Sequence, residues 1–428
     1  MRFGDLFENS TDMKTHQVVL TASALVLAAT ADVYGQEPTT PDWLKKTFDD
    51  TLPSALSDGK FNLNARLRYE HADQVGLKGS DAFTARARFG FTTAPVSGFQ
   101  AMIEAEHTQI LGPDVNFNDG LGNNVGHTVI VDPEQTELNR AWLAYSNWDT
   151  TFKGGRQRII HDGARFIGNV GWRQAEQTFD AVRVINKSVE NLTIDYSYLF
   201  NVSLVTGVTR NSDSHAVNLG YTGLPIGKLT GYTYLIEFPD GPAAQSSATY
   251  GASLSGSRPL NEDVKLNYLG EFAWQTDYGN SALDYQAEYY HLNGGASYKA
   301  FTLAAGYEVL GTDNNVGFYT PLATLAKWNG WADAFLLASQ GTPFNVGGLR
   351  DTYVSGTVKL PYDIPLNVTY HHFTTDIGGT DLGDEIDVTV TKKLTKNLST
   401  LARFAHFDGT STGPADRDKF WLQFDYKF

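Results

Sequence analysis

Residues 61–69 read Phe-Asn-Leu-Asn-Ala-Arg-Leu-Arg-Tyr, an alternation of apolar and polar side chains. Because successive side chains of a β-strand point to opposite faces, this stretch predicts a strand with one dry and one wet face. The alternation recurs along the chain, and Gly, Asn, Asp or Pro clusters bound each run, as hairpin turns require. The further runs are 83–91, 98–109, 192–200, 264–274, 301–309, 366–373 and 386–390.

The composition excludes several classes of function. The 428 residues include no cysteine, which removes disulfides, Cys-ligated metal sites and thiol nucleophiles. The 33 basic and 48 acidic residues give 33 − 48 = −15, and such an acidic chain does not suit nucleic-acid binding. The mean hydropathy is −0.29, yet the chain has 25 Phe, 21 Tyr and 8 Trp. A composition that is rich in aromatic residues but polar on average is typical of a sheet with one face toward water.

The first 35 residues predict export. A short basic start at residues 13–17 and an apolar run at 18–31 match a secretory signal peptide, with cleavage expected after Ala31 or after Gly35. The run of about 14 apolar residues is shorter than the roughly 20 that a membrane-spanning helix needs. Residues 1–12 lack signal character and are attributed to an upstream start codon. Residues 36–59 are expected to form a short periplasmic segment.

Residues 60–428 are predicted to form an all-β fold, a transmembrane antiparallel β-barrel of about 18 strands with long extracellular loops. The connections alternate in length, as such barrels require: 93–98 and 360–365 are tight, whereas 110–135, 159–177 and 311–348 are long. A soluble β-sandwich would also alternate. However, no composition shift divides these residues into two domains, and a single sandwich rarely needs so many strands.

The chain ends in a strand whose apolar positions alternate up to the last residue. Phe420, Leu422, Phe424, Tyr426 and Phe428 share one face. A terminal aromatic of this kind resembles the carboxy-terminal signature of outer-membrane barrels, which the barrel assembly machinery reads. Pairing the last strand with the first would also leave no open edge. We therefore expect the outer membrane of a Gram-negative bacterium, with membrane lipid and lipopolysaccharide around the barrel.

Arginine is concentrated in one part of the chain. Ten of the 16 arginines lie between Arg66 and Arg183, and Arg66, Arg68, Arg86 and Arg88 fall on the polar face that would line a lumen. Because guanidinium pairs with carboxylates through two parallel hydrogen bonds, this favours an electropositive wall that attracts an anionic solute. Acidic residues in the same stretch leave an alternative open: they could pair with the arginines, so that the row of ion pairs is neutral and only stiffens the wall. These acidic residues are Glu70, Glu104, Glu106 and Asp180.

Two long segments are candidate gates or plugs. Residues 161–177 carry Arg165, Trp172 and Arg173, and they would narrow the pore if folded inward or form a surface loop if folded outward. Residues 318–345 include a short helix start at Pro321. The apolar residues of this second segment must be covered by the barrel rim, by lipid headgroups or by the lumen.

Four stretches resemble the alginate-export porin family of outer-membrane proteins. They are Gly155-Arg156-Gln157, residues 165–180 (RFIGNVGWRQAEQTFD), residues 320–333 (TPLATLAKWNGWAD) and Gly348-Leu-Arg-Asp351. The resemblance implies an 18-stranded monomeric barrel whose arginine-rich, anion-selective constriction passes an acidic polysaccharide. It implies as wall candidates Arg66, Arg68, Arg86, Arg88, Arg140, Arg156, Arg158 and Arg183, although only the Gly-Arg-Gln motif matches position by position.

The leading hypothesis is therefore a porin that passes an anionic saccharide, such as a uronate oligosaccharide. A general anion-selective porin and a plugged structural or adhesive barrel are the alternatives. An enzyme is not expected, because the ten His form no HExxH motif and His161-Asp162 and His371-His372 have no nucleophile at a recognisable spacing. We expect no cofactor, no metal and no nucleic-acid partner.

Overall fold

The computed structural model describes residues 53–112, 116–241, 245–336 and 347–428. The expected signal peptide, and most of the expected periplasmic segment, lie outside these residues. A helical turn at residues 53–57 precedes the first strand. Among the described residues, no helix has the length and apolar character needed to cross a membrane.

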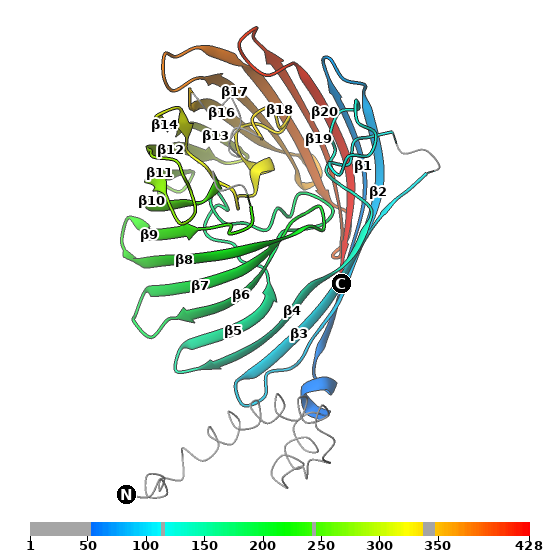
Figure 1. Cartoon of the computed structure of the whole chain (residues 1–428), viewed down its shortest axis with the longest axis vertical. Coiled ribbons are helices and arrows are strands. Elements are labelled where there is room, and N and C mark those ends of the chain that lie inside the picture. Colours follow the sequence, from blue (N-terminus) through cyan, green and yellow to red (C-terminus); the bar gives the residue numbers. More distant parts are fainter. Residues whose placement is uncertain (1–52, 113–115, 242–244, 337–346) are drawn as a thin grey trace, which may run out of the picture.

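One antiparallel sheet of 18 strands dominates the described part of the chain (Figure 1). Each of the eight runs predicted from the alternation of side chains falls on a strand. The strands of the sheet are β1 (Lys60–Gln74), β2 (Ser80–Thr92), β3 (Phe99–Ile110), β4 (Gln135–Asn147), β5 (Thr150–Gln157), β6 (Thr178–Asn186), β7 (Leu192–Ser203), β8 (Thr209–Leu224), β9 (Gly227–Ile236), β10 (Ser247–Pro259), β11 (Val264–Asp277), β12 (Gln286–Tyr298), β13 (Phe301–Leu310), β16 (Leu349–Leu360), β17 (Ile364–Thr374), β18 (Asp381–Lys393), β19 (Leu398–Gly409) and β20 (Arg417–Lys427). The connections hold a small hairpin, β14 (Thr312–Asp313) with β15 (Val316–Gly317), and the 3₁₀ turns η2 (Leu325–Lys327) and η5 (Pro361–Asp363).

The sheet closes on itself. β20 pairs antiparallel with β1, from Asn64 opposite Lys427 to Gln74 opposite Arg417. The terminal residue completes this seam: the Phe428 amide donates to the Leu63 carbonyl at 2.9 Å, and the Leu63 amide donates to the Phe428 carbonyl at 3.1 Å. Closure leaves no unpaired edge, as a membrane-spanning sheet requires. The predicted 18-stranded antiparallel barrel is confirmed.

The two ends of the barrel differ. At the short-turn end, tight connections such as 148–149, 225–226 and 299–300 join neighbouring strands. The first and last strands of the barrel also begin and end there. At the long-loop end lie the connections 158–177 and 311–348. This alternation of short and long connections matches the prediction made from the sequence.

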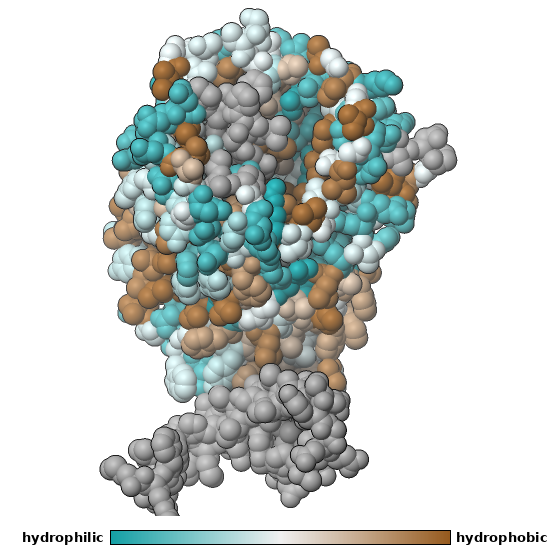
Figure 2. All heavy atoms as spheres, viewed as in Figure 1, coloured by the Kyte–Doolittle hydropathy of each residue, from teal (hydrophilic) through white to brown (hydrophobic). Residues whose placement is uncertain are grey.

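The period of two along each strand separates a lipid-like outer face from a polar inner face. On β1 and β2, Phe61 is 61% exposed and Phe89 58% exposed, whereas Arg68 and Arg86 on the opposite face are buried. Figure 2 shows apolar residues, in brown, spread over the outer surface in view. The apolar side chains therefore point outward and the charged ones point into the lumen, the reverse of a soluble domain.

The described parts of the two long segments fold into the lumen, whereas residues 337–345 of the second segment lie outside the described residues. We name residues 158–177 inner loop 1 and residues 318–336 inner loop 2. Ile167 of inner loop 1 and Phe318 of inner loop 2 are at most 1% exposed, and they belong to a cluster that includes inward aromatic residues of the wall such as Tyr232 and Tyr289. The sequence left three possible covers for the apolar residues of this second segment: the barrel rim, lipid headgroups or the lumen. The structure shows that residues 318–336 are covered inside the lumen.

Candidate functional site

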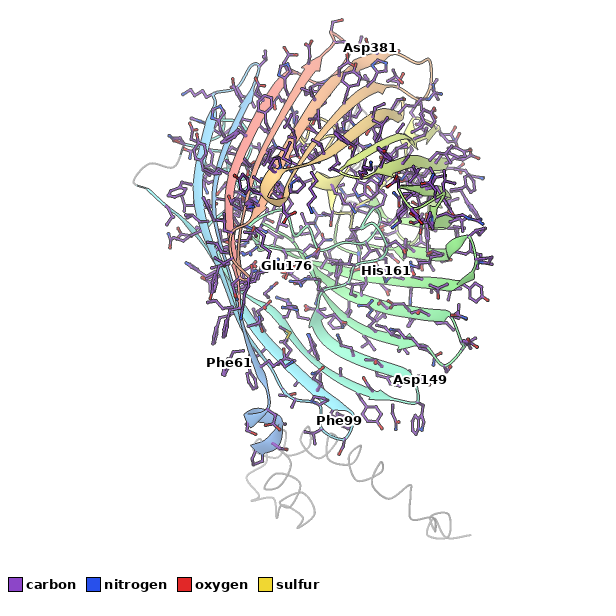
Figure 3. The ribbon with its side chains drawn as sticks, turned by 180° about the vertical axis from the view of Figure 1, so that it is seen from behind. Phe61, Phe99, Asp149, His161, Glu176 and Asp381 are labelled. Atoms are coloured by element: carbon purple, nitrogen blue, oxygen red, sulfur yellow. The ribbon has the colours of Figure 1, made fainter. Side chains whose placement is uncertain are left out.

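The two inner loops are bonded to each other inside the barrel. The Gly168 amide donates to the Leu322 carbonyl at 2.9 Å, and the Thr324 amide donates to the Ala164 carbonyl at 2.9 Å. Figure 3 shows His161 and Glu176, at either end of inner loop 1, in the barrel interior. The loops thus form one crosspiece that narrows the lumen.

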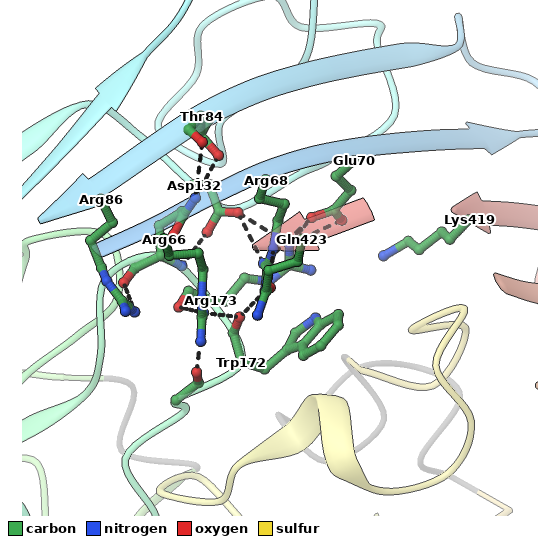
Figure 4. Close-up of polar contacts among 12 residues, drawn as sticks. Arg66, Arg68, Glu70, Thr84, Arg86, Asp132, Trp172, Arg173, Lys419 and Gln423 are labelled. Carbon is green, nitrogen blue, oxygen red and sulfur yellow. Dashed lines mark hydrogen bonds and ion pairs between the residues drawn. The ribbon is translucent and has the colours of Figure 1, made fainter. Parts of the chain in front are cut away.

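Arginines from β1 hold inner loop 1 by its backbone (Figure 4). Nη1 of Arg66 donates to the carbonyls of Gly171, Trp172 and Arg173 at 3.3, 3.0 and 3.0 Å. Nη2 of Arg68 donates to the same Trp172 carbonyl at 2.5 Å. An irregular buried segment has carbonyls without sheet partners, and the fork of N–H donors on arginine satisfies several at once.

Arginines from β2 complete this cradle. Arg86 and Arg88 each donate to the Gln174 carbonyl at 3.2 Å, and Arg88 also pairs with Glu106. Both side chains are less than a tenth exposed. The four wall candidates on β1 and β2 therefore lie under inner loop 1 and support it.

Glu176 anchors the far end of inner loop 1. Its carboxylate accepts hydrogen bonds from Arg158, from Asn139 at 2.8 Å and from Asn169 at 2.6 Å. Burial would raise the pKa of Glu176, but Arg88 and Arg158 outweigh it and lower the pKa to about 2. The carboxylate is therefore ionised at neutral pH although it is fully buried.

Asp333 has the same role for inner loop 2. It lies 2.5 Å from Nζ of Lys419 on β20 and 3.1 Å from Nη2 of Arg173 on inner loop 1. Burial opposes ionisation, yet Lys419 and Arg173 keep the pKa of Asp333 below its ordinary value. A single buried carboxylate thus joins the two loops and the wall.

Three wall candidates remain partly open to the lumen. Arg140 pairs with Glu104 at 2.7 Å and Arg183 with Asp195 at 2.5 Å, while Arg158 pairs with Glu176. Their side chains are 19%, 14% and 31% exposed, in the order Arg140, Arg183, Arg158. Because these arginines have donors beyond those that their acidic partners occupy, they can still bind an anion from the lumen.

Arg156 lies elsewhere. It pairs with Asp180 at 2.7 Å, and the two residues are direct cross-strand neighbours. Phe179 and Ala181 on either side of Asp180 are fully buried on the inner face, so the period of two puts Asp180 and Arg156 on the outer side of the sheet. The structure therefore places Arg156 away from the lumen, unlike the other seven wall candidates.

Lys153 also belongs to the lumen wall, and no feature of the sequence had marked it as a candidate. It stands directly opposite Arg183, and its Nζ lies 4.2 Å from the ring centroid of Trp142. No carboxylate of the described residues lies within ion-pairing distance of this ammonium group. A single lysine between Phe152 and Gly154 forms no distinctive sequence pattern. Only the register of β5 against β6 shows that its side chain faces the lumen.

The three loop candidates occupy different positions. Arg165 is 3% exposed and pairs with Glu308 of β13 at 2.7 Å, which seals it into the wall. Arg173 pairs with Glu70 and Asp333, both at 3.1 Å. Trp172 is partly buried, and its ring stands 5.5 Å from that of Trp421. Arg165 and Arg173 thus fasten the inner loops to the barrel wall, and their side chains are shielded from the open lumen.

A cavity of about 270 Å³ adjoins the two inner loops. Its lining includes Asp162 and Trp328 from the loops and Lys228, Tyr232 and Glu271 from the wall. Lys228 and Asp162 form a partly exposed ion pair at 2.6 Å. Charged side chains from inner loop 1 and from the wall therefore face this cavity.

A closed 18-stranded barrel with an apolar outer face and inward-folded loops defines an outer-membrane porin. A family described as alginate export matches residues 58–315, more than half of the chain, and the protein therefore belongs to the alginate export family. No curated protein sequence matches the chain.

Solved structures of outer-membrane channels share the fold. Acinetobacter baumannii OccAB2 superposes with a TM-score of 0.68 at 14% identity, covering 88% of this chain and 99% of that one. Pseudomonas aeruginosa OpdK, determined with vanillate, gives a TM-score of 0.66 at 16% identity and covers 87% and 99%. Acinetobacter baumannii OccAB4 gives 0.66 at 14% identity and covers 86% and 98%.

Proposed function

We propose that this porin passes an anionic solute, an acidic polysaccharide or a uronate oligosaccharide, along a basic wall formed by β4, β5, β6 and the first residue of inner loop 1. The basic wall consists of Arg140, Lys153, Arg158 and Arg183. The observation that carries the proposal is the surplus charge of Lys153: each of the three arginines has an acidic partner, whereas Lys153 has none among the described residues. The four cations and their three acidic partners, Glu104, Glu176 and Asp195, therefore carry one net positive charge in a chain whose overall charge is −15.

The basic wall can guide a polyanion without trapping it. Free N–H groups of the partly paired arginines and the Lys153 ammonium replace water around successive carboxylates of the solute. Because the acidic partners compete for the same donors, no single site binds so tightly that the solute stops there. Vanillate, named with the OpdK channel, is also a carboxylate, in keeping with an anionic solute.

The arginines on β1 and β2 have a supporting role in this proposal. Arg66, Arg68, Arg86 and Arg88 set the position of inner loop 1 and thereby the width of the passage. The two hypotheses for the arginine-rich stretch thus apply to different parts of it. The arginines on β1 and β2 stiffen the barrel and support inner loop 1, whereas Arg140, Arg158 and Arg183 face the solute together with Lys153.

The setting of the channel follows from the same fold. We infer the outer membrane of a Gram-negative bacterium, with the short turns in the periplasm and the long loops outside. Phe428 at the seam would be read by the barrel assembly machinery, the apolar outer face would contact lipid and lipopolysaccharide, and the barrel would act as a monomer.

Reversal potentials in planar bilayers test the proposal. The wild-type channel should prefer anions, and Lys153→Glu should lower the anion-to-cation permeability ratio by at least about threefold, because it turns the surplus charge of the basic wall negative. Arg258→Glu, at an exposed position near the 260–263 turn, makes the same change in net charge outside the wall and should have little effect. A cation-selective wild type, or equal effects of the two variants, would overturn the proposal.

A plugged structural barrel is the second candidate, and one observation favours it. The inner loops bond to each other and to the wall on β1, β2, β13 and β20, and their apolar residues form the core cluster inside the barrel. Liposome swelling with uronate oligosaccharides distinguishes the two candidates. Swelling by the wild type supports passage, whereas swelling only after removal of residues 318–336 supports the plug.

A further inference from the structure

Arginine and tryptophan side chains from four parts of the chain stack inside the barrel. Cζ of Arg403, on β19, lies 4.0 Å from the ring centroid of Trp172 and 3.7 Å from that of Trp331. Cζ of Arg68, on β1, lies 4.4 Å from the same Trp172 ring. Trp172 belongs to inner loop 1 and Trp331 to inner loop 2. One wall arginine therefore contacts an aromatic ring from each inner loop.

Arg403 makes no ion pair or hydrogen bond among the described residues that would compete with these ring contacts. No carboxylate in the described ranges lies within ion-pairing distance of its guanidinium, and its buried Nε has no hydrogen-bond partner. This distinguishes it from the loop-bearing arginines Arg66 and Arg68, which donate to backbone carbonyls. The two indole faces are therefore the direct contacts of the Arg403 guanidinium, while Asp387 and Asp333 act on its charge from beyond ion-pairing distance. A desolvated guanidinium between such faces is a strong cation–π arrangement.

The wall beside Arg403 continues this aromatic contact. Trp421 of β20 is the cross-strand neighbour of Arg403, is fully buried and meets Trp172 edge to face at 5.5 Å and 76°. Trp172 thus rests on three consecutive strands, β19, β20 and β1. The backbone around Trp331 is bonded to β18, where the Ala332 amide donates to Glu385 at 2.7 Å, and Arg403 holds the indole ring itself.

We propose that Arg403 is a positioning residue that holds Trp331 of inner loop 2 against Trp172 of inner loop 1, beside the backbone hydrogen bonds and the Arg173–Asp333 ion pair that join the same loops, and that loss of its stack widens the passage. The inference rests on the proposed function, because it assigns control of the same passage. It concerns residues beyond the stretch matched to the alginate export family, since both Trp331 and Arg403 follow residue 315.

Single-channel recording of the full chain in planar bilayers tests the proposal. Arg403→Ala should raise the time-averaged conductance by at least about twofold and the open fraction by roughly tenfold, the effect of losing one buried cation–π contact. Arg403→Lys keeps the cation and should restore most of the wild-type behaviour. Arg258→Ala, which removes an exposed arginine, should leave the conductance unchanged.

Tryptophan fluorescence gives a readout that a general loss of stability would not produce. With the barrel shown to be folded by its heat-modifiable gel mobility, Arg403→Ala should make tryptophan more accessible to acrylamide, and Arg403→Lys should not. If Arg403→Ala fails to fold, Trp331→Ala removes the other half of the contact without touching the wall and should give the same conductance increase.

The outcomes separate this proposal from the proposed function. A cation-selective wild type overturns anion passage, yet the conductance ratio of Arg403→Ala to wild type still decides the role of Arg403. A silent wild type with a conducting Arg403→Ala supports the positioning role and favours the plugged barrel. Folded Arg403→Ala and Trp331→Ala proteins with wild-type conductance and wild-type quenching overturn the inference.

Discussion

Nη2 of Arg173 lies 3.1 Å from Oδ2 of Asp333, an ion pair between two loops separated by 160 residues in the sequence. The same carboxylate oxygen accepts a hydrogen bond from Nζ of Lys419 at 2.5 Å. All three side chains are almost fully buried. The loops that narrow the lumen are therefore fastened to each other and to the wall through one acidic group.

Asp333→Ala should release inner loop 2. It leaves the buried charges of Arg173 and Lys419 without their shared partner, which costs about 3–5 kcal/mol in comparable buried pairs. We expect tryptic cleavage after the exposed Lys327 to become at least tenfold faster in the folded barrel. Asp418→Ala is the matched control, because Asp418 pairs with His406 on the outer surface with half of its side chain exposed. Equal cleavage rates in the two variants would contradict this role of Asp333.

Acid should loosen inner loop 1 through Glu176. The pKa of Glu176 is about 2 in the folded protein, below its ordinary value of 4.5. A lowered folded-state pKa means that the ionised carboxylate stabilises the loop above pH 4.5 and that this stabilisation disappears as the pH falls toward 2. The contribution is on the order of 3 kcal/mol.

Conductance recorded from pH 7 down to pH 3 measures this change. The channel should be steady between pH 7 and pH 5 and should become noisier or wider below that range. Glu176→Gln removes the titrating group, so its acid-induced step should vanish. An identical step in wild type and Glu176→Gln would assign the acid sensitivity to other groups.

Gly155→Ala should impair folding of the barrel. Gly155 has a φ of +115°, and a Cβ at this position would lie 2.3 Å from the Ala141 carbonyl oxygen. The backbone conformation and the contact together should cost at least about 2 kcal/mol. Gly154→Ala is an adjacent control, because a Cβ there meets nothing within 4 Å. Heat-modifiable gel mobility should show a lower melting temperature for Gly155→Ala only.

The anion preference should depend on salt and on Lys153. The Debye length falls from about 10 Å at 0.1 M to about 3 Å at 1 M, so salt screens an unpaired lumen charge. Lys153→Met should lower the anion preference clearly at 0.1 M and little at 1 M. A selectivity that is the same at both concentrations would indicate that pore width, rather than the charge of the basic wall, determines it.

The alternation of side chains was enough to predict the barrel, because a sheet with lipid outside and polar groups inside imposes a period of two on every strand. It also placed Arg66, Arg68, Arg86 and Arg88 on the inner face, where the structure finds them. Arg156 was a wall candidate through the family resemblance and not through the alternation, and the structure places it on the outer side of the sheet. Gly154 and Gly155 precede it and carry no side chain that could mark a face, so the alternation gives no direction for Arg156.

The crosspiece could not be derived from the sequence for a different reason. A loop such as 161–177, with its arginines and its tryptophan, is compatible with solvent and with a polar lumen alike. What decides its position is the set of partners on distant strands, such as Glu70 and Asp333 for Arg173. Lys153 and Arg403 were missed for the same reason, since their roles arise from register and stacking across the barrel.

The seam between β1 and β20 determines when the passage can be sealed during assembly. Arg66, which holds three carbonyls of inner loop 1, is itself aligned by Asp425 at 2.9 Å, and Arg68 is aligned by Gln423 at 2.9 Å. Both partners lie on the last strand, so inner loop 1 gains its complete seat only after the two ends of the chain have met. Closure of the seam and complete seating of inner loop 1 are therefore one and the same step of assembly.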